Sequence, residues 1–377
     1  SQGPFEASPA TGVEEATLDR IVDVVHEPPP GFAIHPKLAK QLATRLHVYA
    51  DGQVDWALAE TLAFGSLLLE GTDVRLSGQD TRRGTFSQRH SVLVDYDTGR
   101  EWTALHHLGT GSVPERTGRQ AKFWAYDSLL SEYAALGFEY GYSVVHRDAL
   151  VLWEAQFGDF ANGAQIIIDQ FLTAAEDKWG QSSGLVLLLP HGFEGQGPEH
   201  SSARLERYLQ SCAEDNLQVA NCTTPANYFH ILRRQLKRDI RKPLILMTPK
   251  SLLRHKRAVS SLDSMAIGTS FHRLLADGAE KPGEHKVRLV SDNKIRRVLL
   301  CTGKVYYDLF EERERREIDD VYLLRVEQLY PMPLKALVSE LQRFGNAQIA
   351  WCQEEPKNMG PWTFVMPDIE AVMDGLG

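Results

Sequence analysis

Two histidines and two carboxylates follow a short apolar run near the middle of the chain. The run, residues 185–189, is typical of a strand buried on both faces of a parallel sheet. The loop after it contains His191, Glu194, Glu199 and His200, with three glycines that let backbone approach a ligand closely. Because open α/β sheets place ligands at the carboxyl ends of their strands, this segment predicts a functional site. From spacing alone an ordinary surface loop explains it equally well, and it lacks the Lys-Ser/Thr ending of a phosphate-binding loop.

One carboxylate and two aromatic residues are further candidates. Glu132 stands near the start of a predicted helix, where the helix dipole favours negative charge, and an apolar face follows it. Because a buried carboxylate without a partner is costly, Glu132 is either a salt-bridge member or a functional group. Phe157 and Phe160 follow a predicted strand in a loop with Gly and Asn, and face either a cleft or the core.

The composition is that of an ordinary globular protein. The chain has 377 residues, 43% of them hydrophobic and 24% charged, which leaves room for two or three domains. The net charge of −9 argues against a nucleic-acid-binding surface, which would be basic. Basic residues at 233–242 are predicted to form a solvated helix face rather than a binding site. No apolar run approaches membrane-spanning length.

The cysteines and the chain ends give expectations about the cellular compartment and about the length of the natural protein. The four cysteines are scattered without a C-x-x-C pair, so zinc and dithiol chemistry are unsupported and a reducing compartment is expected. The first residues resemble neither a signal nor a transit peptide. Because the chain begins without methionine and stops abruptly at Gly377, we expect it to be a piece of a longer protein.

Alternating strands and helices predict an α/β fold with parallel sheets and helices on both faces. Apolar runs predict strands at 74–77, 149–153, 185–189, 217–222, 243–247, 298–301, 321–326 and 348–352. Helical patterns cover 36–47, 55–70, 129–142, 166–175, 224–239, 306–313 and 334–344. We divide the chain into a lead-in at 1–50, an α/β domain at 51–256, a linker at 257–293 and a second α/β domain at 294–377.

Three motifs together resemble one family. They are WEAQFGDFANGAQ at 153–165, LPHGFEGQGPEHSSARLER at 189–207 and KVYYDL at 304–309. They look like the thiamine-diphosphate-dependent decarboxylating component of 2-oxoglutarate dehydrogenase, and the similarity covers most of residues 32–360. A resemblance of this length is far more specific than a single short motif.

The resemblance implies a transketolase-like fold whose active site lies between two domains. One domain of the family holds the diphosphate through a Gly-Asp-Gly motif and a metal ion, and the other holds the aminopyrimidine ring. This sequence has no such Gly-Asp-Gly motif, so it resembles only the carboxyl-terminal half. Residues 51–256 would be the pyrimidine-binding domain, and 294–377 a third, truncated domain. Mg²⁺ and its ligands are expected from the missing half, with no metal ligand in this chain.

The resemblance also assigns roles in cofactor binding. Glu132 matches the glutamate that hydrogen-bonds the pyrimidine ring nitrogen, which would make it both a cofactor-binding and a catalytic residue. Phe160 matches the ring that stacks on the aminopyrimidine, with Phe157 beside it. Gln79 matches a polar residue near cofactor and substrate.

Histidines are expected at the reacting carbon. His200 and His191 match active-site histidines that would stabilise developing charge or pass protons, and His200 would also contact substrate. His90 is a further substrate-binding candidate, with a hydrogen bond within its own loop as the alternative role. The third domain resembles the part that binds nucleotide or acetyl-coenzyme A effectors in some relatives, and Arg234 is a candidate for such a site.

The implied function is oxidative decarboxylation of 2-oxoglutarate in the tricarboxylic acid cycle, with succinyl transfer to a lipoyl group of a partner acyltransferase. A related substrate such as 2-oxoadipate, or a non-catalytic assembly module, remains an alternative. The expected assembly is a homodimer or a heterotetramer-like complex, with no nucleic acid or membrane partner. The expected location is the bacterial cytoplasm or the mitochondrial matrix.

Overall fold

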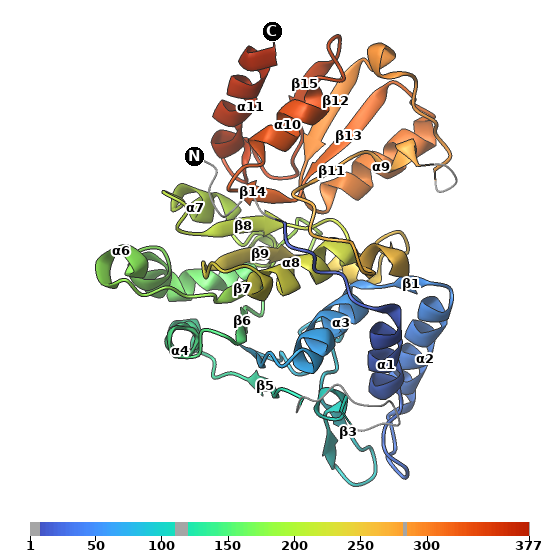
Figure 1. Ribbon diagram of the computed structural model, residues 1–377, viewed down its shortest axis with the longest axis vertical. Helices are drawn as coiled ribbons and strands as arrows, with labels where there is room; N and C mark the ends of the chain where they lie inside the picture. The colour runs from blue at the N-terminus through green and yellow to red at the C-terminus, as the bar shows by residue number, and fades with distance from the viewer. Residues whose placement is uncertain (1–7, 110–119, 282–284, 377) are drawn as a thin grey trace.

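The computed structural model describes residues 8–109, 120–281 and 285–376. Within these ranges a seven-stranded and a four-stranded sheet form the framework of two α/β units (Figure 1). Most neighbouring strands in both sheets are parallel, and the edge strands β14 and β11 are antiparallel. The predicted α/β fold with parallel sheets is therefore confirmed.

The larger sheet contains the strands that position the candidate site. In spatial order they are β14 (Gln328–Tyr330), β8 (Gln218–Asn221), β9 (Leu244–Thr248), β7 (Val186–Pro190), β6 (Leu150–Glu154), β2 (Val74–Gly78) and β5 (Phe123–Asp127). Five of them agree with the predicted runs to within about two residues. The edge strands β5 and β14 were not predicted.

Alternate residues of the central strand β7 pack into two hydrophobic cores, one on each face of the sheet. Val186 and Leu188 pack on the side of α3 (Trp56–Leu69) and α8 (Pro225–Lys237). Leu187 and Leu189 pack on the opposite side. The helices there are α4 (Glu132–Val145), α5 (Gln165–Ile167), α6 (Ala175–Trp179) and α7 (Leu205–Gln210). A strand buried on both faces reads as a continuous apolar run, as this one does.

The helices on the first face begin at polar caps. The Asp55 side chain accepts a hydrogen bond from Leu58 N at 2.7 Å, which satisfies a free amide at the start of α3. Thr224 caps α8 in the same way through Asn227 N. Two further helices, α1 (Glu15–His26) and α2 (Pro36–Ala50), lie outside α3 and occupy most of the predicted lead-in (Figure 1).

Two sequence predictions need correction here. The predicted helix at 166–175 is interrupted, because residues Ile168–Leu172 form a π-helical turn that keeps Ile168 and Leu172 both buried. The basic residues at 233–242 do not form a solvated face, because Arg233, Arg234 and Arg238 are buried. The Arg233 guanidinium reaches Glu70 at 2.8 Å, so part of this charge is internally paired.

The smaller sheet has the order β11 (Leu274–Leu275), β13 (Val321–Val326), β12 (Arg297–Cys301) and β15 (Gln348–Trp351). Its helices are α9 (Val305–Arg316), α10 (Leu334–Leu341) and α11 (Trp362–Leu376). The segment 257–293, which we predicted to be a linker, contributes β11 to this sheet. It also contributes β10 (Ser260–Ser261), which pairs with β1 (Gln53–Val54). A hairpin of β3 (Leu93–Val94) and β4 (Glu101–Trp102) lies before β5.

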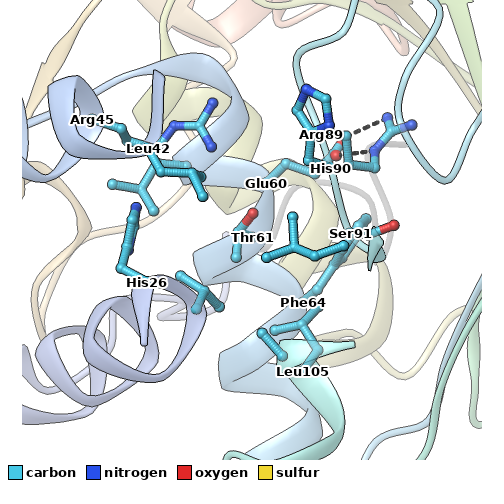
Figure 2. Close-up of a pocket in the computed structure, with 14 residues that line it drawn as sticks. His26, Leu42, Arg45, Glu60, Thr61, Phe64, Arg89, His90, Ser91 and Leu105 are labelled. Atoms are coloured by element: carbon cyan, nitrogen blue, oxygen red, sulfur yellow. Dashed lines mark hydrogen bonds and ion pairs between the residues drawn. The ribbon is translucent and has the colours of Figure 1, made fainter. Parts of the chain in front are cut away.

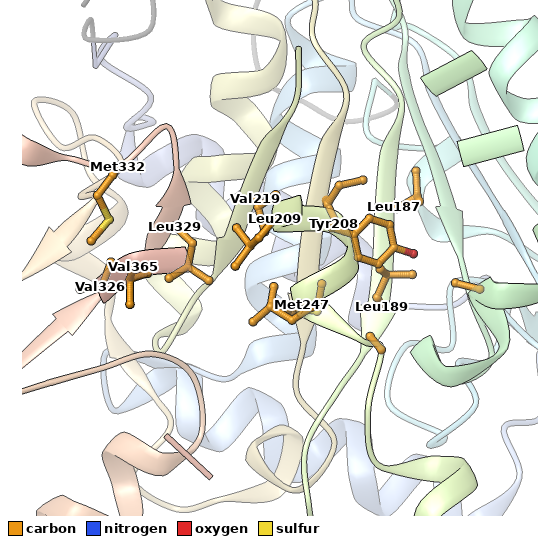
Figure 3. Close-up of a cluster of buried hydrophobic side chains, with 14 of the residues drawn as sticks. Leu187, Leu189, Tyr208, Leu209, Val219, Met247, Val326, Leu329, Met332 and Val365 are labelled. Atoms are coloured by element: carbon orange, nitrogen blue, oxygen red, sulfur yellow. The ribbon is translucent and has the colours of Figure 1, made fainter. Parts of the chain in front are cut away.

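The two units share one hydrophobic core. Strand β14 belongs to the later part of the chain but pairs with β8 at the edge of the larger sheet. Val326, Leu329 and Val365 join the same cluster as Leu209 and Val219 (Figure 3). The second unit is thus packed against the first through apolar side chains and through a strand. In the described residues, no helix is long and apolar enough to cross a membrane.

Candidate functional site

The candidate residues lie in loops after five neighbouring strands of the larger sheet. Strands β9, β7, β6, β2 and β5 are adjacent and mutually parallel, so their carboxyl ends meet at one edge. The loops that leave this edge carry Lys250, His191 and His200, Phe157 and Phe160, Gln79, and Glu132. This is the edge at which open α/β sheets place their ligands.

Glu132 occupies the first turn of α4 with a defined set of neighbours. Ser131 caps the helix by accepting a hydrogen bond from Ala134 N. The Gln79 amide nitrogen donates to Oε1 of Glu132 at 3.2 Å and to the Leu130 carbonyl at 3.1 Å. A Cβ added at Gly163 would lie 3.2 Å from Oε2, so glycine leaves that oxygen uncovered. Within the described residues, Gln79 is the hydrogen-bond partner of this half-buried carboxylate, and Oε2 has none.

Phe157, Phe160 and His200 form a cluster of rings. The ring centroids of Phe157 and His200 are 4.3 Å apart, and the other two pairs are 5.6 and 5.9 Å apart. Phe160 lies on the short helix Gly158–Ala164, which also carries Gly163. That helix therefore links the ring cluster to Glu132, as the predicted grouping of these residues requires.

The His200 imidazole keeps part of its surface open. Its side chain is 30% exposed, and Nδ1 lies 3.2 Å from Oε1 of Glu199. The backbone of the same residue is fixed by Lys250, whose ammonium donates to the carbonyls of His200 and Gly192. Lys250 itself is buried, and burial lowers its pKa. The arrangement holds the loop while leaving the imidazole face available.

His191 is placed differently from His200. Its side chain is buried, and Nε2 lies 2.9 Å from Oε1 of Glu355 in the second unit. Nδ1 accepts a hydrogen bond from Ala203 N at 3.0 Å, so Nε2 carries the ring proton and donates it to Glu355. Both ring nitrogens are therefore used within the chain. This geometry favours a structural role for His191 over direct contact with a ligand.

His90 lies apart from the ring cluster. Its backbone is left-handed, with φ of 49°, and Nε2 is 3.1 Å from the Ser87 carbonyl. Burial lowers its pKa, and the hydrogen bond to Ser87 opposes this. Figure 2 shows it beside a cavity of about 40 Å³ that Arg45 and Glu60 also line. The structure does not group His90 with Glu132 or His200.

Sequence reasoning missed a buried ion network beneath the site. The Arg89 guanidinium lies 2.5 Å from Glu60 of α3 (Figure 2). On its other side it lies 2.5 Å from Glu154, the last residue of β6. Tyr228 donates to Glu60 at 2.6 Å, and Thr81 donates to Glu154 at 3.1 Å. The network fixes the ends of β2 and β6, from which the site loops depart. The one available signal was a charged residue, Glu60, inside an otherwise apolar helix.

Arg234 is not in the ring cluster or near Glu132. It is buried on α8, and its guanidinium carbon lies 4.2 Å from the centroid of the Phe271 ring. Nη2 donates to Oε1 of Gln218 at 3.3 Å, whereas Nε and Nη1 have no partner in the described residues. Burial and the neighbouring arginines lower its pKa. Its role in effector binding stays a prediction.

Within the described ranges, no three His, Cys, Asp or Glu side chains are grouped so that they could hold a metal ion. Glu60 and Glu154, which contact the same guanidinium, are paired with Arg89 instead.

Comparison with known proteins identifies both units. Residues 52–256 match the family described as transketolase, pyrimidine binding domain, and residues 259–376 match 2-oxoglutarate dehydrogenase C-terminal. A relative from Brucella anthropi, named 2-oxoglutarate dehydrogenase E1 component, is 60% identical over 364 residues, which is 96% of this chain and 36% of that protein. Relatives of the same name from Brucella ovis and Brucella canis are 61% identical over the same shares.

The chain spans about a third of the length of the curated relatives it matches. The resemblance inferred from the three motifs is confirmed over both units. The chain therefore belongs to the transketolase pyrimidine-binding domain family, joined here to the carboxyl-terminal domain of 2-oxoglutarate dehydrogenase.

Proposed function

We propose that this chain supplies the pyrimidine-binding half of an enzyme that decarboxylates 2-oxoglutarate with thiamine diphosphate. The observation that carries the proposal is the setting of Glu132. It combines a helix N-terminus, a Gln79 hydrogen bond to one oxygen, and a second oxygen left uncovered beside Gly163. The comparisons with the E1 components of Brucella support the same reaction.

The residues present fit a flat heteroaromatic ring with a hydrogen-bonding edge. The uncovered Oε2 of Glu132 can accept a hydrogen bond from, or donate one to, a ring nitrogen. Phe160 on the neighbouring short helix and Phe157 just before it offer half-buried ring faces, and stacking would fix the orientation of a bound ring. When bound, thiamine diphosphate supplies the electron sink for loss of carbon dioxide.

The side chains of this chain would then do two things. Glu132 would hold a proton at the pyrimidine nitrogen, and Gln79 would keep its carboxylate oriented by binding Oε1. His200, whose ring is partly open, would stabilise negative charge that develops on the substrate or deliver a proton to it. Diphosphate and Mg²⁺ would be held by the part of the relatives that this chain does not cover.

The assembly is part of the same proposal. Apolar side chains on and near α4 are exposed, among them Tyr133, Phe138 and Ile166, which is the kind of surface that another protein surface covers. We propose that it meets the remaining part of the enzyme or a second subunit. From the family resemblance we also propose succinyl transfer to a lipoyl acyltransferase and a role in the tricarboxylic acid cycle. Because the relatives compared are bacterial, we propose the bacterial cytoplasm rather than the mitochondrial matrix as its location.

The test measures decarboxylation with the complete enzyme, in which this chain is joined or mixed with the part it lacks. The Glu132→Ala variant is compared with Glu370→Ala, which changes an exposed glutamate on α11. We expect Glu132→Ala to reduce turnover of 2-oxoglutarate about 10²–10⁴-fold, the range for loss of a general acid–base group. Glu370→Ala should retain wild-type turnover.

Substrate choice is tested in the same assay. A higher kcat/KM for 2-oxoadipate than for 2-oxoglutarate would replace the proposed substrate. If the complete enzyme binds thiamine diphosphate and Mg²⁺ by calorimetry but turns over no 2-oxo acid, the enzymatic function is wrong and an assembly role takes its place.

A further inference from the structure

The loop between His191 and Ala203 is tied down within its own unit at several points. Lys250 bridges the carbonyls of Gly192 and His200, so one ammonium joins the two ends of the loop. Gly192 N also donates to the Ser201 carbonyl at 2.9 Å. Asp159 accepts hydrogen bonds from Ser201 N at 3.1 Å and Ser202 N at 3.0 Å. Glu194 of the loop also accepts hydrogen bonds from Ser251 N at 3.0 Å and Ser251 Oγ at 2.8 Å, so all of these contacts tie the loop to its own unit.

The second unit supplies a further set of contacts to this loop. Glu355, which follows β15, accepts the Nε2 proton of His191, and the opposite nitrogen of the same ring accepts Ala203 N. One imidazole thus connects the second unit to both the first and the last residue of the loop. The neighbouring Glu354 accepts from Phe193 N at 3.1 Å and pairs with Lys304 at 2.8 Å.

Burial makes the contact between Glu355 and His191 specific. The two side chains are 5% and 4% exposed, so either would be costly to leave without its partner. Burial alone would raise the pKa of Glu355, but the hydrogen bond from His191 Nε2 outweighs it and holds that pKa below the usual value. An acceptor fixed in this way sets the orientation of the imidazole and, through Ala203, the exit of the loop.

The loop also carries the ring that faces the candidate site. His200 lies three residues before Ala203 and packs against Phe157 with centroids 4.3 Å apart. We propose that Glu355, acting through His191, is a positioning residue for His200, so that the second unit takes part in shaping the active site. The inference rests on the proposed function for its kinetic consequence. Lys304, the first residue of the KVYYDL motif at 304–309, contributes to the same set of contacts because it pairs with Glu354.

The experiment has one arm that needs no activity. Hydrogen–deuterium exchange of residues 192–202 is compared in the complete enzyme for wild type, Glu355→Ala, Glu355→Gln and the surface control Glu312→Gln. We expect Glu355→Ala to increase exchange in this loop at least about tenfold, because it removes the acceptor that orients His191. Glu355→Gln keeps an acceptor oxygen and should restore most of the protection, and Glu312→Gln should match wild type. Unchanged exchange in Glu355→Ala overturns the proposal whatever the enzyme catalyses.

The second arm measures turnover of 2-oxoglutarate. A displaced His200 should lower kcat about 10–100-fold in Glu355→Ala, because small errors in position cost rate, while KM changes less than about threefold. Glu355→Gln should recover most of the lost kcat. A faster-exchanging loop with kcat within twofold of wild type overturns the positioning role. If Glu355→Ala does not fold, Glu355→Asp replaces it, since the shorter side chain withdraws the carboxylate from His191. Absence of any wild-type turnover would count against the proposed function, and the exchange arm would still decide whether Glu355 holds the loop.

Discussion

Helices α3 and α4 are both 14 residues long and lie on opposite faces of the same sheet, yet their surroundings differ. Twelve residues of α3 are buried, including Glu60, whereas five residues of α4 are buried. Phe138 and Val145 of α4 are 60% and 87% exposed, and Leu129 and Leu130 just before it are also exposed. The one charged side chain of α3, Glu60, is bound by Arg89 and Tyr228 of this chain.

The difference in burial between α3 and α4 indicates that the two helices have different roles. α3 is apolar on all sides because α1, α8 and the sheet surround it, and its one buried charge is matched by Arg89. α4 begins at the carboxylate of Glu132, and several of its apolar side chains are exposed. It therefore carries both a candidate catalytic group and an apolar surface that another protein could cover. Changes in α3 should therefore affect stability, and changes in α4 should affect assembly and activity.

The largest effect on stability should come from removing the charge that matches α3. Arg89→Met leaves Glu60 and Glu154 buried without a counterion, which should lower the free energy of unfolding by about 3–5 kcal/mol. Urea unfolding followed by circular dichroism measures it. Arg83→Met is the matched control, because Arg83 lies in the same loop and is half exposed. Equal stability of the two variants would show that the network is not needed for the fold.

A matched pair of leucines tests the packing difference directly. Leu62→Ala on α3 removes a fully buried side chain and should cost about 2–5 kcal/mol of unfolding free energy. Leu130→Ala, before α4, removes a side chain that is 79% exposed and should change it by less than about 0.5 kcal/mol. Both values come from the same urea titrations. A large loss in Leu130→Ala would mean that this surface is already covered.

Hydrophobic periodicity predicted most of the strands and helices but few of the side-chain contacts between them. The strands β2, β6, β7, β8 and β9 were predicted because a strand buried on both faces is apolar throughout. Helices α1 and α11 were missed. α1 lies in a segment that we read as a lead-in, and α11 contains Pro367. Edge strand β5 has a mixed pattern because it is only partly buried.

The candidate residues of the site were named where they are close in sequence or match a family motif. Glu132, Phe157, Phe160 and His200 were named that way, and the structure brings the three rings together. The contacts that position them join distant residues: Gln79 meets Glu132 across 53 positions, and His191 meets Glu355 across 164. Such pairs leave no periodic trace, so Lys250, Arg89 and Glu355 could not be found from one sequence.

The exposed apolar surface beside α4 predicts an effect of mutation on assembly. Ile166→Asp, at a residue that is 60% exposed beside α4, should leave the unfolding free energy of this chain within about 0.5 kcal/mol of wild type. It should weaken association with the remaining part of the enzyme or a second subunit at least about tenfold, as a charge does in an apolar interface. Sedimentation velocity over a concentration series measures this. Unchanged association would place the interface elsewhere.

The smallest expected effect on stability comes from the ion pairs that join Glu70, after α3, to Arg233 and Lys237 of α8. Burial would raise the pKa of Glu70, which follows α3, but the hydrogen bonds and charges of Arg233 and Lys237 outweigh it and hold that pKa below its usual value. A carboxylate with a lowered pKa in the folded state stabilises fully above its unfolded pKa of about 4.3, and the stabilisation is lost as the pH falls through the lowered value. Glu70→Gln should therefore be less stable than wild type at pH 7, by less than about 1 kcal/mol because solvent screens the partly exposed pair. The gap should close as the pH falls below about 4. Urea titrations at both pH values measure it, and a gap that widens in acid would show that this ion pair does not join the two helices.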